Sequence, residues 1–100
     1  MKITIEQEGS ETLIRLVGQL DTLTAVDFEK EIQQVLQSEV AAVVLDGAEL
    51  TYVSSAGLRL LLTLQKGMTA KGGSLLLKNI KEEIMDIFNI TGFSSILTIE

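Results

Sequence analysis

Strand-type and helix-type apolar patterns alternate along this chain, and their order constrains the fold more than any other feature. Residues Val40–Leu45 form a continuous apolar run, which is typical of a strand buried on both faces of a parallel sheet. Other apolar residues recur at helical spacing and predict a helix with one buried face: Phe28, Ile32, Val35 and Leu36. The alternation predicts an α/β fold, with a mainly parallel sheet of about five strands and three helices in one domain over residues 1–100.

The individual segments can be placed from turn and capping residues. Strands are expected at 1–7, 12–17, 40–45, 74–77 and 94–99, with Gly9-Ser10 turning the first two into a hairpin. The first helix is expected to be capped by Thr24, the second to run from about Ser55 to Lys71, and the third to follow a capping box of Asn79 and Glu82. The segment 46–54 is expected to be a loop.

Two helices show further apolar stripes, and glycines mark their ends. The expected buried stripes are Leu58, Leu61, Leu62 and Gln65 in the second helix, and Ile80, Ile84, Ile87 and Phe88 in the third. Gly72-Gly73 and Thr91-Gly92 are expected to end these helices. Met85, Ile90 and Phe93 form either part of the core or an apolar contact patch, and the core is the simpler interpretation.

The residue types that are missing exclude whole classes of chemistry. The chain has no cysteine and no histidine, so it has no disulfide, no thiolate ligand and no Ser-His-Asp or Cys-His catalytic group. We therefore expect no cofactor and no metal. The formal net charge of −6 argues against nucleic acid and anionic lipid as partners, and solubility explains the acidity most simply.

The apolar segments are too short and too interrupted to cross a bilayer, and the start lacks the apolar run of a signal peptide. We predict a cytoplasmic, monomeric protein. An enzyme is not expected. Segment 67–74 has the two glycines of a phosphate loop, but Gly73 replaces the lysine and a strand follows instead of a helix. Most acidic residues fall on solvent faces of the expected helices, so no carboxylate pair is indicated.

The segment Tyr52-Val53-Ser54-Ser55-Ala56-Gly57-Leu58 is the sharpest local feature, because it leads into a helix start. Either serine can cap that helix, and a phosphate on either would meet free N–H groups and the positive end of the helix dipole. The small residues Ala56 and Gly57 would let another backbone approach. The pattern alone favours a plain cap over a phosphorylation site.

Four segments, in order and over nearly the whole chain, resemble the STAS domain (sulfate transporter and anti-sigma factor antagonist) family. They are Gly18-Gln19-Leu20-Asp21, similar to a G-x-L-D segment; Ser54-Ser55-Ala56-Gly57-Leu58 after Asp46 and Tyr52; Gly72-Gly73-Ser74-Leu75-Leu76-Leu77; and Ile90-Thr91-Gly92-Phe93. Each motif is weak alone, and their shared order and spacing make the resemblance specific.

The resemblance implies a bacterial anti-sigma factor antagonist that works by partner switching. Such a protein binds an anti-sigma factor that is also a serine kinase, and so frees a sigma factor for transcription. Phosphorylation by the kinase breaks the complex, and a serine phosphatase restores it. The phosphoacceptor would be Ser55, with Ser54 as the runner-up because it replaces a common aspartate.

The resemblance also implies a partner-binding surface around that serine. Its expected residues are Asp21, Thr22, Ser54, Ser55, Ala56, Gly57 and Arg59. Asp21 matches an acidic residue that the family places near the phosphorylation site, and a solvated loop aspartate is the less favoured alternative. Arg59 stands where a small residue is common. If Asp21 and Asp46 lie near Ser55, a phosphate would sharpen a negative patch and repel a partner. The alternative is an accessory docking subunit of a transporter or stress-signalling assembly, without a phosphorylation switch.

Overall fold

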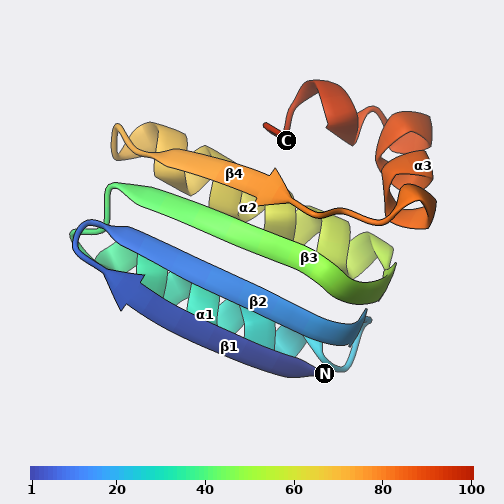
Figure 1. Cartoon of the computed structure of the whole chain (residues 1–100), viewed down its shortest axis with the longest axis horizontal. Coiled ribbons are helices and arrows are strands. Elements are labelled where there is room, and N and C mark those ends of the chain that lie inside the picture. The colour runs from blue at the N-terminus through green and yellow to red at the C-terminus, as the bar shows by residue number, and fades with distance from the viewer.

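A four-stranded sheet with two helices on one face forms the frame of the molecule (Figure 1). This computed structural model describes residues 1–100. The strands lie in the order β1 (Lys2–Glu8), β2 (Glu11–Leu20), β3 (Ala42–Val53) and β4 (Ser74–Lys78). β1 runs antiparallel to β2, whereas the pairs β2–β3 and β3–β4 are parallel.

The helices occupy two places relative to the sheet. Helices α1 (Ala25–Gln37) and α2 (Ser55–Ala70) lie side by side behind it and leave the opposite face uncovered (Figure 1). Helix α3 (Glu82–Thr91) and the 3₁₀ helix η1 (Phe93–Ser95) lie beyond β4. No helix is long and apolar enough to span a bilayer. The predicted α/β fold with three helices is confirmed, but the sheet is mixed and has four strands rather than about five.

The expected strand at 94–99 is the one that does not form. Its first residues turn instead into η1, where the Leu97 N–H donates to the Phe93 carbonyl at 2.9 Å. The segment meets the sheet at a single point, an isolated parallel bridge between Ile99 and Leu77. The alternation of apolar residues in this segment is thus used for packing at the edge of β4, and not for a ladder.

The expected loop at 46–54 is also wrong, because β3 continues through it to Val53. Its register with β2 shifts twice, between Arg15 and Val17 and again between Gly18 and Gln19. Each shift places one extra residue in β3, and such bulges break the period-two alternation by which a strand is recognised. The bulged strand delivers its C-terminal end to the start of α2.

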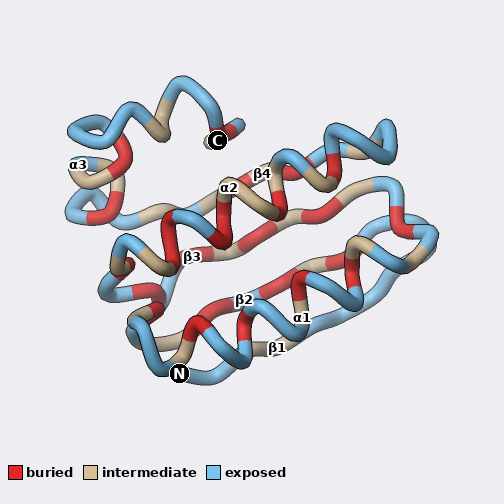
Figure 2. The backbone as a smooth tube through the Cα atoms, turned by 180° about the vertical axis from the view of Figure 1, so that it is seen from behind, coloured by how far each residue is buried: buried red, intermediate tan, exposed pale blue.

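The core lies between the sheet and the two helices that cover it (Figure 2). Phe28, Ile32 and Val35 are buried along α1 as predicted. In α2 the predicted stripe is only partly right, because Leu62 and Gln65 are only half-buried and the buried face includes residues outside the stripe. The residues of α2 that are buried are Gly57, Leu58, Leu60, Leu61, Leu64 and Met68. This wider face follows from its position, because α2 contacts α1 as well as the sheet.

The start of α3 differs from the prediction. Asn79 does not cap the helix; it takes a left-handed conformation (φ 59°), and its amide donates to Asp46 Oδ1 at 3.2 Å. The helix begins after Lys81, so Ile80 precedes it, while Ile84 and Phe88 are buried as expected. The left-handed Gly92 ends α3, as its sequence position predicts.

The candidate apolar patch on this helix divides between core and solvent. Met85 and Phe93 are partly buried against the core, which agrees with the simpler interpretation. Ile90 instead is 85% exposed.

Candidate functional site

Strands β2 and β3 end side by side, and this brings the two candidate segments together. Leu20 pairs with Val53 in the parallel register, so Asp21 and Ser54 are the first residues after the two strands. The Ser54 N–H donates to the Leu20 carbonyl at 2.8 Å. The turn after β2 and the start of α2 are therefore joined by a direct backbone hydrogen bond.

Gly57 brings these two segments into contact. It is buried in the first turn of α2, and a Cβ atom at this position would lie 2.7 Å from Cγ of Leu20 and 3.1 Å from its carbonyl oxygen. Contacts this short exclude any side chain unless Leu20 or the backbone shifts. The glycine of the Ser-Ser-Ala-Gly-Leu motif thus fits α2 against the end of β2.

Asp21 organises the turn that follows β2. Its Oδ1 accepts hydrogen bonds from the N–H groups of Leu23 and Thr24, both at 3.0 Å. The Thr24 hydroxyl donates to the Gln19 carbonyl at 2.8 Å and accepts from the Asp21 N–H. Thr24 does precede α1 as predicted, but its side chain makes no capping bond to the helix. Asp21 is thus a structural turn residue rather than a freely solvated one.

Asp21 is held in its charged form. The hydrogen bond from the Thr24 N–H is the main reason why the pKa of this carboxyl lies below its ordinary value of 3.8. The nearby amino group of Met1 lowers the pKa of Asp21 further. A fixed negative charge therefore stands on the turn next to α2.

The two serines have different environments. Ser54 is half-buried, and its Oγ accepts a hydrogen bond from the Gly57 N–H at 3.2 Å, so it is the N-cap of α2. Ser55 is the first residue of the helix; it is exposed, and its hydroxyl makes no hydrogen bond within the chain. Only one of the two hydroxyls is thus already in use.

The start of α2 also favours an anion. The first helical turn contains no acidic side chain, and its leading N–H groups have no partner within the helix. The positive end of the helix dipole adds to this preference. No group of three or more His, Cys, Asp or Glu side chains that could hold a metal ion occurs in the chain.

An exposed apolar surface continues from the site along α1. Leu23 is 84% exposed and Val26 is 56% exposed, although both are strongly apolar. A hollow of about 150 Å³ lies beside Val26. It is lined by Ala25, Val26, Glu29, Ala56, Arg59 and Leu60. Sequence reasoning missed Leu23 and Val26; their signal is that they fall outside the buried stripe that begins at Phe28.

The predicted partner-binding residues therefore come together at one end of the sheet. Asp21 and the exposed Thr22 lie on the turn, Ser54 and Ser55 at the start of α2, and Arg59 one turn further along the same helix. Of the predicted set only Gly57 is buried, so its role is in packing.

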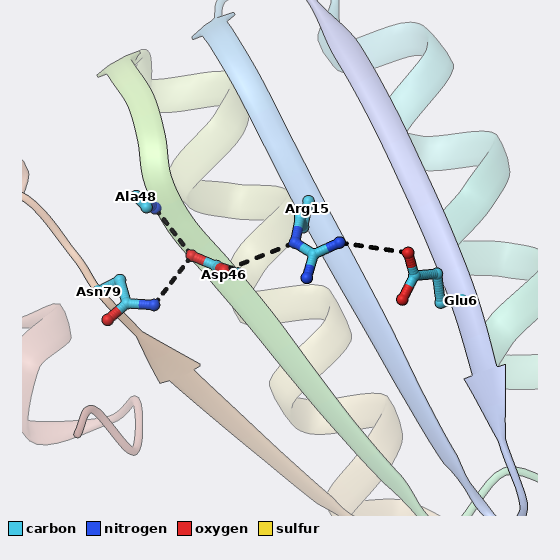
Figure 3. Close-up of polar contacts among 5 residues, drawn as sticks. All are labelled: Glu6, Arg15, Asp46, Ala48 and Asn79. Atoms are coloured by element: carbon cyan, nitrogen blue, oxygen red, sulfur yellow. Dashed lines mark hydrogen bonds and ion pairs between the residues drawn. The ribbon is translucent and has the colours of Figure 1, made fainter.

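Asp46 does not join this site. It precedes Val53 by seven residues in β3, which corresponds to about 20 Å along a strand. It lies on the uncovered sheet face, where its Oδ1 accepts from the Ala48 N–H and from Asn79, and its Oδ2 lies 3.7 Å from Arg15 Nε (Figure 3). Arg15 also pairs with Glu6 at 3.2 Å. This cluster links side chains from β1, β2 and β3 with Asn79, which follows β4. It is separate from Ser55.

The stability of the chain is expected to depend on Asp46 at low pH. Burial alone would raise the pKa of this carboxyl, but the hydrogen bonds from Ala48 and Asn79 and the charge of Arg15 outweigh it and hold the pKa below 3.8. A depressed folded-state pKa contributes stability above pH 3.8 that is lost as the pH falls through the lower value. Thermal unfolding should therefore show Asp46→Asn destabilised at neutral pH, with the difference from the unchanged chain closing below pH 3.8. A constant difference across this range would contradict the assignment.

Comparison with known proteins identifies the family. The model of the STAS domain matches residues 2–100. The chain belongs to the STAS domain family. BtrV of Bordetella bronchiseptica (strain ATCC BAA-588 / NCTC 13252 / RB50), a proposed anti-sigma factor antagonist, is 32% identical over 99 residues, which are 99% of this chain and 85% of BtrV. The anti-sigma-B factor antagonist of Bacillus subtilis (strain 168) is 26% identical over 106 residues, covering 99% of this chain and 90% of the relative.

Solved structures support the same fold for this STAS domain. The phosphorylated form of the Bacillus cell fate determinant SpoIIAA aligns with a TM-score of 0.79 at 21% identity, over 99% of this chain and 91% of SpoIIAA. The family resemblance seen in the sequence is thus confirmed, and the chain is similar to anti-sigma factor antagonists. These relatives are named for antagonising another protein and not for a catalysed reaction.

Proposed function

We propose that this STAS domain is an anti-sigma factor antagonist that binds an anti-sigma factor with serine-kinase activity and is released when Ser55 is phosphorylated. The observation that carries the proposal is the free, exposed hydroxyl of Ser55 at the first position of α2. Ser54 next to it is already engaged as the helix cap. The proposal is supported by the similarity to named antagonists and to SpoIIAA, which has been solved in a phosphorylated form.

The position of Ser55 suits a switch that leaves the fold intact. A phosphate at the first residue of a helix meets free N–H groups and the helix dipole, so α2 should tolerate it. The phosphate adds about 1.5 to 2 negative charges beside the ionised Asp21 turn. A partner surface that accepts the neutral hydroxyl would then meet repulsion and a costly desolvation.

In this proposal the partner contacts a continuous surface around the serine. Asp21, Thr22, Ala56 and Arg59 frame the hydroxyl, and the exposed Leu23 adds apolar area. A serine phosphatase would return the protein to its binding form. The domain would act in the cytoplasm, where it would regulate transcription that depends on the sigma factor.

The first experiment is an intact-mass measurement of the protein purified from its host, with fragmentation to locate any modification. One phosphate on Ser55 is expected in part of the population. A phosphate on Ser54 would keep the switch but move the acceptor. A chain that is never phosphorylated under growth or stress would favour the constitutive docking subunit instead.

The second experiment measures binding to the anti-sigma factor by calorimetry. We expect Ser55→Ala to bind like the unchanged chain and Ser55→Asp to bind about 5- to 150-fold more weakly, a coupling of about 1–3 kcal/mol. Thr69→Asp is the matched control, because it adds the same charge at an exposed position near the other end of α2. Equal affinity of all variants would refute the switch and favour the docking subunit.

A further inference from the structure

The two edges of the sheet are treated differently. On the outer side of β4, Leu77 is engaged by the C-terminal segment: its N–H donates to the Thr98 carbonyl, and its own carbonyl accepts from the Glu100 N–H, both at 2.9 Å. β1 pairs only with β2, and no element lies on its outer side (Figure 1). Seven residues long, it contains no proline and no register shift. An uncovered edge of this kind is a template for pairing with another strand.

The hairpin geometry shows which backbone groups face outward. The two-residue turn at Gly9 and Ser10 closes on the pair Glu8–Glu11, which makes this a hydrogen-bonded pair. Even-numbered residues of β1 therefore bond to β2, and the N–H and C=O groups of Ile3, Ile5 and Gln7 point away from it. These odd-numbered residues place their side chains on the helix-covered face, and none of them is charged.

We infer that the outer edge of β1 binds a second copy of this chain, strand against strand and antiparallel, which joins two sheets into one of eight strands. The strand is complementary to itself in charge. When Ile5 of one copy stands opposite Ile5 of the other, Lys2 of each copy faces Glu8 of the other. All six outward N–H and C=O groups then find partners, because Ile3 faces Gln7 on both sides of the centre.

The isolated chain leaves the charged ends of this strand uncompensated. The two ion pairs of the chain both involve Arg15, so Lys2 and Glu8 have none. Glu8 lies directly opposite Glu11 in the hairpin, and like charges so placed destabilise a strand pair. A second copy would bring an ammonium group beside each of these carboxylate pairs.

The side chain of Ile5 gains cover in the same arrangement. It is 38% exposed, and it borders a hollow of about 320 Å³ between the edge of β1 and α1. Placing two Ile5 side chains together at the centre removes both from water. The strands run antiparallel, so the two Ser55 sites would lie at opposite ends of the joined sheet, and both would stay open. This inference does not depend on the proposed function, and it departs from the monomer expected from the sequence.

Charge reversal tests the pairing without disturbing the fold. Sedimentation equilibrium at chain concentrations up to about 0.5 mM should show a monomer–dimer equilibrium for the unchanged chain. Lys2→Glu and Glu8→Lys should each weaken dimerisation about tenfold, since each places like charges opposite each other twice. The double variant Lys2→Glu/Glu8→Lys restores opposite charges and should recover the dimer. A chain that remains monomeric, or a double variant no better than the singles, would overturn the inference.

A proline at the centre of the strand gives a second test. Ile5→Pro removes an N–H that points away from β2, so the hairpin ladder should survive, and circular dichroism can verify this. The variant should be monomeric at every concentration. A dimer that tolerates this proline would place the interface elsewhere and refute the edge pairing.

Discussion

Replacing Phe28 by alanine is expected to lower the free energy of unfolding by about 3–5 kcal/mol. Phe28 is fully buried on the face of α1 that contributes to the core, so its removal leaves a cavity there. A domain of this size has a total stability of only about 5–15 kcal/mol. The variant should therefore lose a large share of the total stability and unfold at a clearly lower urea concentration.

Urea denaturation followed by circular dichroism measures this loss. Val26→Ala is the matched control, because Val26 lies on the same helix and is 56% exposed. It should change the stability by no more than about 0.5 kcal/mol. A Phe28→Ala variant with the stability of this control would mean that α1 does not hold the core as described.

Replacing Gly57 by valine should cost about 3 kcal/mol of folding free energy and also weaken partner binding. A Cβ atom at this position meets Leu20 Cγ at 2.7 Å, so α2 has to move away from the end of β2. That movement strains the bond from the Ser54 N–H to the Leu20 carbonyl and displaces Ser55 from the Asp21 turn. The loss of binding should persist under conditions in which the variant is fully folded.

The second-site change Leu20→Ala tests whether the loss caused by Gly57→Val comes from crowding against Leu20 or from an effect of valine on α2 alone. It removes Cγ and Cδ2, the two side-chain atoms closest to the new Cβ atom, and leaves only the carbonyl contact at 3.1 Å. The double variant should thus show less than the sum of the two single losses in denaturation experiments. Strict additivity would show that Gly57 and Leu20 are not coupled.

The sequence predicts the elements whose patterns depend on local structure. The stripe of α1 and the glycine end of α3 follow from helical spacing and from the left-handed conformation that Gly92 supplies. The cap of α2 could be narrowed to two serines, but only the geometry shows that Ser54 fills it and leaves Ser55 free. The motif residues around Ser55 were found through a family pattern, and their shared location follows from the parallel pairing of β2 and β3.

The failures arise where tertiary contacts override local pattern. The segment after Asp46 is predicted as a loop although β3 continues through it. Each bulge adds a residue to β3 and so reverses which side chains face the core, and this breaks the alternation that predicts a strand. Asn79 followed by Glu82 imitates a capping box, yet the Asn79 amide bonds instead to Asp46 on a neighbouring strand. No local signal distinguishes these two uses of an asparagine.

The position of Met1 has a practical consequence for labelling this domain. Its Cα lies 3.5 Å from the point where a Cβ on Gly18 would stand, and its amino group lowers the pKa of Asp21. A purification tag or fluorophore placed before Met1 would therefore obstruct both the Asp21 turn and the β1 edge. It would also remove the positive charge of the Met1 amino group near Asp21. The other end of the chain lies past β4, on the far side of the sheet from β1 (Figure 1). Probes attached after Glu100 would report on partners without obstructing either surface.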